Sequence, residues 1–248
     1  MKPRLSLAAT HALAHAATSL RGALAVAALV LASGCATGPN ANPADPFEPL
    51  NRQVSRFNDT LDDAVLRPVA TAYRQVLPSP VRSGVNNFFG NLSDVWSFAN
   101  SVAQLKLQNS AETFMRVNVN TFFGLGGLLD VATETGLNRH NEDFGQTLGR
   151  WGVPSGPYLV LPLLGPSTVR DAAALILDIQ GDPVNYINDI PVRNSLYFLR
   201  LVDIRSNLLR VSQLLGDAAL DKYTFTRDAF LQRRRYEIHD GDLPDDGN

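Results

Sequence analysis

Cysteine and histidine are scarce in this chain of 248 residues, which contains one cysteine, Cys35, and four histidines. A single cysteine excludes a disulfide within the chain. Only His140 and His239 lie beyond the first 34 residues, and two histidines are too few for a metal site. The chain also lacks the nucleophile elbow Gly-x-Ser-x-Gly, the phosphate-binding loop Gly-x-x-x-x-Gly-Lys-Ser and the zinc motif His-Glu-x-x-His. The sequence therefore predicts no cofactor, no metal and no enzymatic activity.

Acidic residues are absent from residues 1–34, which carry three basic residues and an uninterrupted apolar run over 23–32. This pattern is typical of a signal peptide, because the run has about half of the roughly 20 residues that a membrane-spanning helix needs. Small residues at 32–34 precede Cys35, as signal peptidase II requires. We therefore expect Cys35 to be acylated, with palmitate among its chains, as a permanent membrane anchor. The alternative is a free or intermolecularly bonded cysteine.

Positive charge is not in excess. Without the leader, 19 Lys and Arg remain against 24 Asp and Glu, a formal net charge of −5, which argues against a nucleic-acid partner. Ala36 follows the cysteine where an aspartate would favour retention at the inner membrane, so we expect the outer membrane. The expected organisation is a signal peptide over 1–34, a lipidated tether over 35–44, one helical domain over 45–239 and a disordered acidic tail over 240–248.

Apolar residues recur every three or four positions through most of the mature chain. Phe47, Leu50, Val54, Phe57 and Leu61 set this period at the start, which predicts an amphipathic helix rather than a strand. The same period predicts helices over 66–76, 81–90, 92–102, 168–178, 192–215 and 221–238, and a further helix that begins with a capping box at Asn109 and Glu112. No alternating run supports a sheet of any size. The predicted fold class is all-α.

Two long stretches carry no charge. The first, over 117–129, contains Gly124, Gly126 and Gly127 just before Asp130, which predicts a helix end that turns into a glycine-hinged hairpin. These four positions are candidate hinge or channel residues, with a plain tight turn as the equal alternative. The second stretch, over 152–169, holds four prolines, which exclude a membrane-spanning helix. We expect it to be extended, and either buried in protein or laid at an interface.

Charged clusters have plain interpretations. The arginines of the last predicted helix, Arg227, Arg233, Arg234 and Arg235, are typical of a solvated face, with anionic lipid headgroups or an acidic partner as the alternative. The acids near the first helix, Asp45, Glu48, Asp62 and Asp63, favour solvation or helix-start electrostatics over acid–base chemistry.

The order of short motifs between residues 45 and 178 resembles the MlaA (VacJ) lipoprotein family. The motifs are Asp45-Pro46-Phe47-Glu48, Asn51-Arg52, Phe57-Asn58, Arg67-Pro68-Val69-Ala70, Phe88-Phe89, Asn91-Leu92, Asn120-Thr121, the glycine cluster with Asp130-Val131-Ala132, Glu142-Asp143-Phe144-Gly145-Gln146-Thr147-Leu148-Gly149, Gly156-Pro157-Tyr158, Leu161-Pro162, Gly165-Pro166-Ser167-Thr168 and Arg170-Asp171. One departure is Asp94-Val95, where the family often has a proline.

The resemblance implies a ring-like, all-helical protein seated in the periplasmic leaflet of the outer membrane. It also implies an amphipathic central channel, a trimeric porin partner, and passage of misplaced outer-leaflet phospholipid to a soluble periplasmic carrier. Candidate lipid- or leaflet-facing residues are then Phe47, Leu50, Phe57, Tyr158, Leu161 and Leu163. No nucleotide site is visible in the sequence, so direction must come from partners.

Two other classes remain open at this point. A structural lipoprotein could brace porins without conducting lipid. A lipid hydrolase is the weaker alternative, in which Ser167 or Ser155 would act without a nearby histidine pattern.

Overall fold

The structure, a computed structural model, describes residues 42, 45–218 and 220–242. Cys35, the predicted leader and all of the predicted tether except Asn42 lie outside the described residues. So does the predicted tail from residue 243 onward. Within the described part, Asp240 belongs to the fold rather than to a disordered tail, because its carboxylate accepts a hydrogen bond of 2.8 Å from Lys106 Nζ.

The predicted predominance of helix is confirmed. The α-helices are α2 (Glu48–Leu61), α3 (Arg67–Val76), α4 (Ser79–Ala103), α5 (Leu107–Phe122), α6 (Val131–Glu134), α7 (Phe144–Arg150), α8 (Val169–Gly181), α9 (Ile190–Ala218) and α10 (Lys222–Ile238). A π-helical turn η1 (Asp62–Leu66) and a 3-10 turn η2 (Pro183–Tyr186) join some of them, and two short strands are β1 (Tyr158–Leu161) and β2 (Gly165–Thr168).

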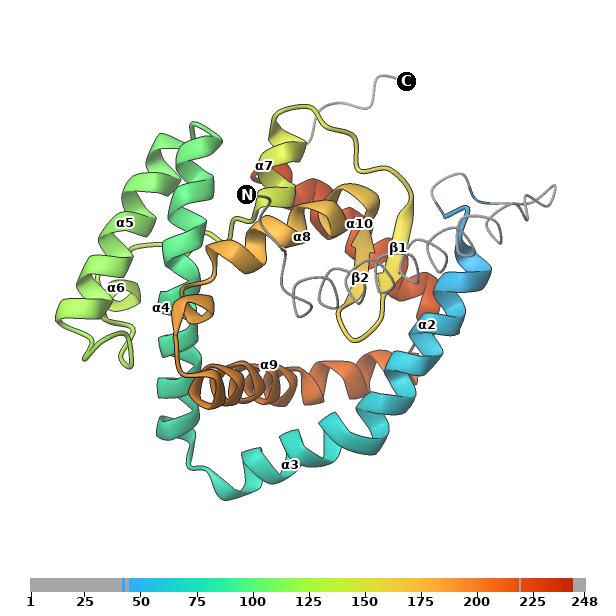
Figure 1. Ribbon diagram of the computed structural model, residues 1–248, viewed down its shortest axis with the longest axis horizontal. Helices are drawn as coiled ribbons and strands as arrows, with labels where there is room; N and C mark the ends of the chain where they lie inside the picture. Colours follow the sequence, from blue (N-terminus) through green and yellow to red (C-terminus); the bar gives the residue numbers. More distant parts are fainter. Residues whose placement is uncertain (1–41, 43–44, 219, 243–248) are drawn as a thin grey trace, which may run out of the picture.

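The elements form a closed frame (Figure 1). Helices α2 and α3 run along two sides, α4 forms the third side, and α8 with the β1–β2 hairpin completes the circuit. The circuit closes through packing, since α4 contacts α7 and η2, α8 contacts the hairpin, and β1 contacts α2. Helix α5 packs outside the frame against α4, and α6 packs against α5. The ring-like outline implied by the resemblance is thus present in the backbone.

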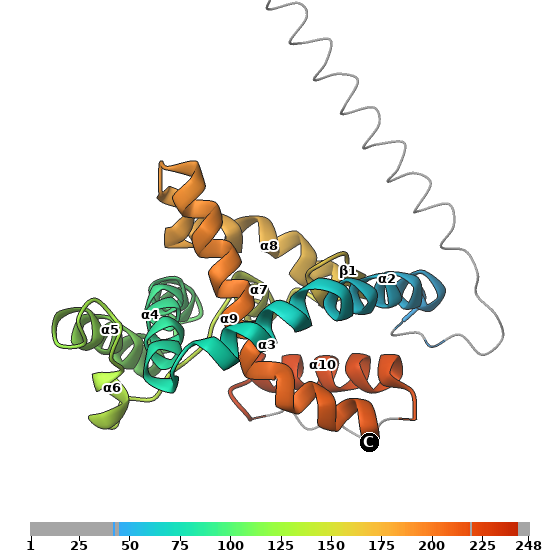
Figure 2. The same cartoon turned by 90° about the horizontal axis from the view of Figure 1, so that it is seen from below.

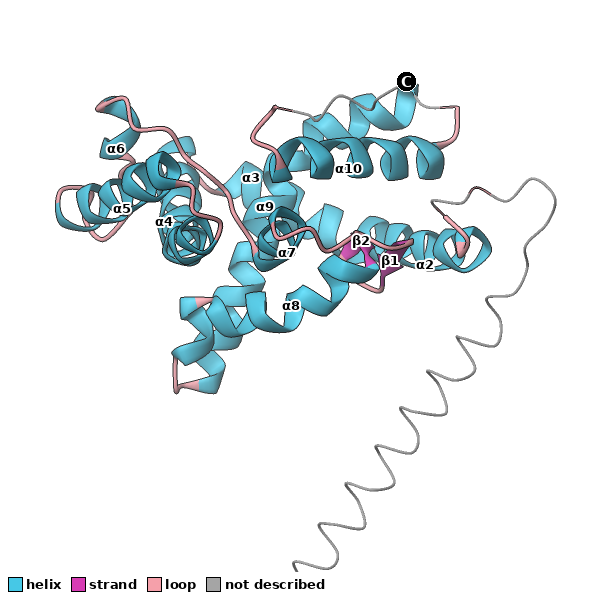
Figure 3. Cartoon of the chain, turned by 90° about the horizontal axis from the view of Figure 1, so that it is seen from above, coloured by secondary structure: helices cyan, strands magenta, loops and turns pink. Residues whose placement is uncertain are grey.

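Helix α9 passes obliquely through this frame. Figures 2 and 3 show that it begins on the side of α8 and ends on the opposite side, where α10 lies. Polar side chains tie it to the frame: Asp203, which is 2% exposed, accepts hydrogen bonds from Tyr73 Oη (3.0 Å) and Asn86 Nδ2 (3.1 Å). Arg205 makes a two-pronged ion pair with Asp62 at 2.6 and 2.7 Å. The helix is therefore held by polar groups in the interior.

The first two predicted helices form one continuous helical run. Pro68 lies at the start of α3 and has no N–H to donate, and the π-helical turn over 62–66 accommodates that missing bond before it. The run ends at Val76, where Leu77 is extended before Pro78, as the sequence predicted.

Two predicted helix boundaries were wrong. Helix α4 continues through Gly90 instead of ending there. The glycine at this position makes room for Arg139, since a Cβ there would lie 2.6 Å from Arg139 Nη1. Helix α5 begins at Leu107 with Lys106 as its N-cap residue and no side-chain cap, so Asn109 and Glu112 do not form a capping box. Glu112 instead accepts hydrogen bonds from Gln108 and pairs with His140.

The proline-rich segment is extended, as predicted, but it contains a two-stranded antiparallel hairpin that the sequence did not predict. Tyr158 pairs with Thr168 and Leu161 with Gly165 in the strand register. Leu163, with φ of 67°, and Gly165, with φ of 83°, make the turn. The single described core cluster of buried hydrophobic residues, Tyr158, Val160 and Tyr223, joins this hairpin to α10.

Two asparagines of α2 take the place of a neighbouring strand along β1. Asn51 donates to Tyr158 O (3.0 Å) and accepts from Val160 N (2.9 Å). About two helical turns further on, Asn58 donates to Leu161 O (3.0 Å) and accepts from Leu163 N (2.8 Å). Their spacing of seven residues places both amides on one side of the helix, so they satisfy the edge of a strand that β2 pairs only on its other side.

No helix in the described ranges is both long enough and apolar enough to cross a membrane.

Candidate functional site: an apolar exterior around a polar interior

The interior of this protein is mostly polar, and many large apolar side chains lie on its exterior. Among the described residues, 22 of the buried residues are polar or charged and only 10 are hydrophobic, whereas large apolar side chains are exposed throughout the surface. Soluble monomers bury their apolar side chains and rarely leave large apolar patches open. The exterior itself is therefore the candidate functional surface, and polar contacts support it from within.

The densest apolar exposure lies on the lobe, which we define as residues 105–137, comprising α5, α6 and the loops beside them. Its exposed apolar side chains are Leu105, Leu107, Phe114, Met115, Phe122, Phe123, Leu125, Leu128 and Leu129. Leu107 is 81% exposed and Phe123 is 73% exposed. No polar rim interrupts the Phe122–Leu125 stretch, because three of its four residues are large and apolar and the fourth is Gly124.

The glycine cluster turns the chain at the end of α5. Gly126 and Gly127 have φ of 72° and 93°, a left-handed backbone that favours glycine. Gly127 also allows close packing, because a Cβ there would lie 2.7 Å from Asn91 Nδ2. These features support the tight-turn alternative; a hinge or channel role for Gly124, Gly126 and Gly127 stays a prediction.

A buried ionic cluster holds this turn to α4. Arg116, 1% exposed, makes a two-pronged hydrogen bond to Asp130 at 2.8 and 3.0 Å. Arg116 Nε lies 3.7 Å from Asp94 Oδ2, and Arg139 Nε donates to the same oxygen at 3.3 Å. Asp94, the position that departs from the family pattern, is completely buried. Asn120 completes the cluster by donating to Asp130 (3.0 Å) and accepting from Ala132 N (2.9 Å).

The pKa values of the two aspartates of the cluster, Asp94 and Asp130, are shifted in opposite directions. Burial raises the pKa of Asp94 despite the nearby Arg139 and Arg116. Burial also acts to raise the pKa of Asp130, but hydrogen bonds from Thr133, Asn120 and Arg116 outweigh it and lower the pKa to about 2. Asp130 is thus a charged structural anchor and the N-cap of α6.

The candidate leaflet-facing residues divide into three groups. Phe57 and Leu163 are exposed, at 55% and 63%, and remain candidates. Phe47, Leu50 and Leu161 are half-buried. Tyr158 is 1% exposed, so its assignment to a lipid-facing surface was wrong. Its ring packs edge-on against Tyr223 with centroids 6.2 Å apart, because alternate residues of β1 point inward.

Both interpretations of the arginines were wrong for Arg227 and Arg234. These two side chains are buried, and Arg234 binds Asp143 through two hydrogen bonds of 2.6 Å and Asp171 through one of 2.9 Å. Arg227 reaches Asp45 at 3.3 Å. Asp45, interpreted from sequence as a solvated or helix-start acid, is 2% exposed and also accepts from Tyr223 Oη at 2.5 Å. Charged pairs thus add to the small hydrophobic cluster under α10.

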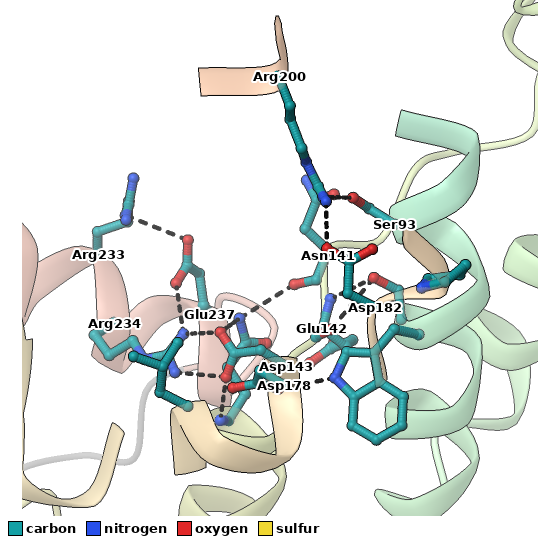
Figure 4. A pocket seen from close by; sticks show the side chains of 15 residues that line it. Ser93, Asn141, Glu142, Asp143, Asp178, Asp182, Arg200, Arg233, Arg234 and Glu237 are labelled. Atoms are coloured by element: carbon teal, nitrogen blue, oxygen red, sulfur yellow. Dashed lines mark hydrogen bonds and ion pairs between the residues drawn. The ribbon is translucent and has the colours of Figure 1, made fainter. Parts of the chain in front are cut away.

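A polar hollow of about 460 Å³ opens between α4, α8, α9 and α10 (Figure 4). Arg200 comes from α9, Arg233 and Glu237 from α10, and Asp178 from α8. Asp178 Oδ1 accepts from Trp96 Nε1 and Phe144 N, both at 2.8 Å. Sequence reasoning missed this hollow. The signal was present in the motif over 142–149, which supplies Glu142, Asp143 and Gln146 to its wall.

An apolar groove of about 380 Å³ lies between α3 and α9. Val69, Val76, Phe198, Leu199 and Val202 line it, and its surface is almost wholly apolar. The protein thus presents a polar hollow and an apolar groove on the same through-going helix, α9.

Groups that could carry catalysis are sparse in the described part of the chain. No cluster of three or more His, Cys, Asp or Glu there could hold a metal ion. His140 pairs with Glu112 at 2.8 Å. Ser155 and His239 line a common hollow of about 370 Å³, yet no hydrogen bond joins them among the described residues. Ser167 is buried and donates to Thr168 O.

Comparisons with known proteins agree on one family. Residues 43–237 match the model of the MlaA lipoprotein. The intermembrane phospholipid transport system lipoproteins MlaA of Shigella flexneri and of Escherichia coli K12 are each 33% identical over 216 residues, which cover 85% of this chain and 85% of each relative. A solved structure described as the structural basis for maintenance of bacterial outer membrane lipid asymmetry is 34% identical, with a TM-score of 0.69, and covers 78% of this chain and 98% of its own.

Proposed function

This chain belongs to the MlaA lipoprotein family, and its membership supports a role in intermembrane phospholipid transport; from that premise we propose a specific task for it. Anchored through Cys35 in the periplasmic leaflet of the outer membrane, the protein removes phospholipid that has strayed into the outer leaflet. The lipid passes through the centre of the frame and is handed to a soluble periplasmic carrier.

The observation that carries this proposal is the exchange of polar and apolar residues between interior and exterior. Burying a leucine or phenylalanine away from water is worth roughly 1.5–3 kcal/mol. Eight exposed leucine and phenylalanine side chains on the lobe, together with Met115, provide enough apolar surface to hold the molecule in hydrocarbon without a spanning helix. A polar interior supports the seating in the leaflet, because buried polar groups are satisfied by one another rather than by lipid.

The frame offers both halves of a phospholipid a suitable surface. Moving a lipid out of its leaflet exposes its tails to water at about 0.8 kcal/mol per CH₂. An apolar groove between α3 and α9 suits acyl chains, and the polar hollow beyond it suits a headgroup. Such a path lowers the barrier to lipid movement and requires no bond to be made or broken. Direction then comes from partners, namely a trimeric porin beside the protein and the soluble carrier.

The test is the phospholipid content of the outer leaflet in cells that lack this protein. The cells are complemented with the native gene or with Cys35→Ala. Accumulation of surface phospholipid that only the native gene reverses supports anchored lipid removal. Unchanged surface phospholipid contradicts it and favours the alternative, a lipoprotein that braces porins without moving lipid.

Purified protein separates the two classes directly. Protein in liposomes should hand labelled phospholipid to a soluble acceptor, whereas a scaffold should not. Ser155→Ala and Ser167→Ala should leave this handover unchanged. A loss of handover in either alanine variant, with lysophospholipid formed by the native protein, would support a lipid hydrolase instead.

A further inference from the structure

The lining of the polar hollow contains one buried acceptor that lacks a donor. Gln146 is 3% exposed, and its Nε2 donates to Asn141 O (3.1 Å) and Asp143 Oδ2 (3.4 Å). Those two oxygen partners fix the orientation of the amide, which makes Oε1 the acceptor. Oε1 is buried and has no hydrogen-bond partner among the described residues. An acceptor left in this state indicates a missing donor.

Asp178 on α8 offers a second acceptor. Its Oδ1 already accepts from Trp96 and from the Phe144 backbone, so Oδ2 is the oxygen left for a further donor. Burial raises the pKa of Asp178, so the hydrogen bonds from Trp96 and Phe144 compensate its charged form only in part. A cationic donor beside it would supply the rest of that compensation.

Two arginines give the hollow an anion-binding side. Arg200 donates Nη1 to Asp182 Oδ2 (2.7 Å) and Nη2 to Ser93 Oγ, which positions its guanidinium over the hollow. Arg233 lies on α10, across the hollow from Arg200. It pairs with Glu237 of the same helix at 3.3 Å, and its side chain is 68% exposed. Figure 4 shows Arg200 and Arg233 on different helices at separate sides of the lining, with Asp178 apart from both.

The overall charge of the lining discriminates between ligands. Five acids line the hollow against three arginines, a formal balance of −2; they are Glu142, Asp143, Asp178, Asp182 and Glu237 against Arg200, Arg233 and Arg234. A singly anionic ligand meets a net negative wall, whereas a zwitterion can give its phosphate to the arginines and its ammonium to the acids.

We propose that this hollow is a headgroup site that selects phosphoethanolamine lipids over phosphoglycerol lipids. The ammonium donates to Gln146 Oε1 and Asp178 Oδ2, and the phosphate lies against Arg200 and Arg233. This inference rests on the proposed lipid transport and names the headgroup class that the transport site prefers.

The test measures headgroup binding separately from transport. Dihexanoyl phosphatidylethanolamine, dihexanoyl phosphatidylglycerol and free phosphoethanolamine are titrated below micellar concentration into the full-length protein. Trp96, which lines the hollow, reports binding by fluorescence in a Trp151→Phe background that leaves it as the one remaining tryptophan. We expect the phosphatidylethanolamine to bind about ten-fold more tightly than the phosphatidylglycerol.

Asp178→Asn is the informative variant, because asparagine keeps the Oδ1 that accepts from Trp96 and Phe144 but loses the charge. It should abolish most of the preference. Asp59→Asn is the matched control, since it removes one charge from an exposed pair with Lys222 outside the hollow, and it should keep the preference. Unchanged circular dichroism confirms that both variants fold; should Asp178→Asn unfold, the comparison of ligands on the native protein still decides.

Equal binding of the two lipids by the native protein would overturn the headgroup proposal. Vesicle-to-acceptor transfer is measured in parallel, and transfer in that case would still support the proposed function. Binding of free phosphoethanolamine as tight as that of the lipid would also overturn it, because the ligand would then be a small metabolite. Headgroup preference without any transfer would contradict the proposed function instead.

Discussion

The lobe over 105–137 and the corner formed by α2, the β1–β2 hairpin and α10 differ in the interactions that hold their elements together. The corner retains a small apolar cluster of Tyr158, Val160 and Tyr223, and amides of Asn51 and Asn58 bind its strand. The lobe places its large apolar residues outside and is joined internally and to α4 through buried Arg116, buried Asp94 of α4 and partly exposed Asp130. The comparison teaches that a segment which presents apolar residues outward must hold itself together with charge.

The largest effect is expected at the ionic cluster. Arg116→Met removes the buried cation between Asp94 and Asp130 and leaves only the more exposed Arg139 beside them, so the free energy of unfolding in detergent should fall by about 3–5 kcal/mol. Lys222→Met is the control, because it breaks an exposed pair with Asp59 and should cost less than about 1 kcal/mol. Equal losses in the two variants would show that the lobe does not depend on buried charge.

The asparagine pair tests the corner. Asn51→Ala leaves the buried Tyr158 O and Val160 N without their side-chain partner and removes one of the donors to Asp45, so it should cost about 2–3 kcal/mol. Asn58→Ala should cost about 1 kcal/mol, because Asn58 is half-buried and Leu163 is exposed, which lets water replace the amide. Chemical denaturation of both variants gives the ranking. A larger loss for Asn58→Ala would contradict the role assigned to burial.

Acid should weaken the lobe through Asp130. The pKa of Asp130 in the fold is about 2 against an unperturbed 3.8, so its charged form contributes stability that is present above about pH 4 and is lost as pH falls toward 2. Asp94 acts in the opposite sense, since a raised pKa favours its protonated form in the fold. Asp130→Asn should remove the acid-sensitive part, as hydrogen exchange of α5 and α6 amides between pH 4 and pH 2.5 would measure. Identical acid sensitivity in the variant would contradict this assignment.

The sequence predicted the helices well where one face is apolar. The period at Phe47, Leu50 and Val54 predicts α2, and Pro78 correctly predicts the end of α3. It failed at Gly90, because a glycine inside a helix looks like a terminus until Arg139, 49 residues later, is seen beside it. The hairpin over 158–168 was missed because four-residue strands with proline are too short to show alternation.

The site was predicted only in part. Exposed apolar residues such as Phe57 and Leu163 follow from composition, but Tyr158 could not be distinguished from them without knowing which way β1 faces. Arg116, Asp94 and Asp143 look like ordinary surface charges in sequence, since patterns of charge carry no information on burial when the partners are far apart in the chain. Two signals in the sequence were available and unused, namely the spacing of seven between Asn51 and Asn58 and the motif over 142–149.

The central claim is that the apolar exterior lies in hydrocarbon while the α10 side stays in water. Spin labels on a Cys35→Ala background test it most directly, because the chain has no other cysteine. One label replaces Phe123, which is 73% exposed on the lobe, and the other replaces Asp228, whose side chain is 60% exposed on α10. In outer-membrane-like vesicles, the label at 123 should be quenched by oxygen and protected from a water-soluble nickel chelate, and the label at 228 should show the reverse. Equal access of the chelate to both labels would contradict the account.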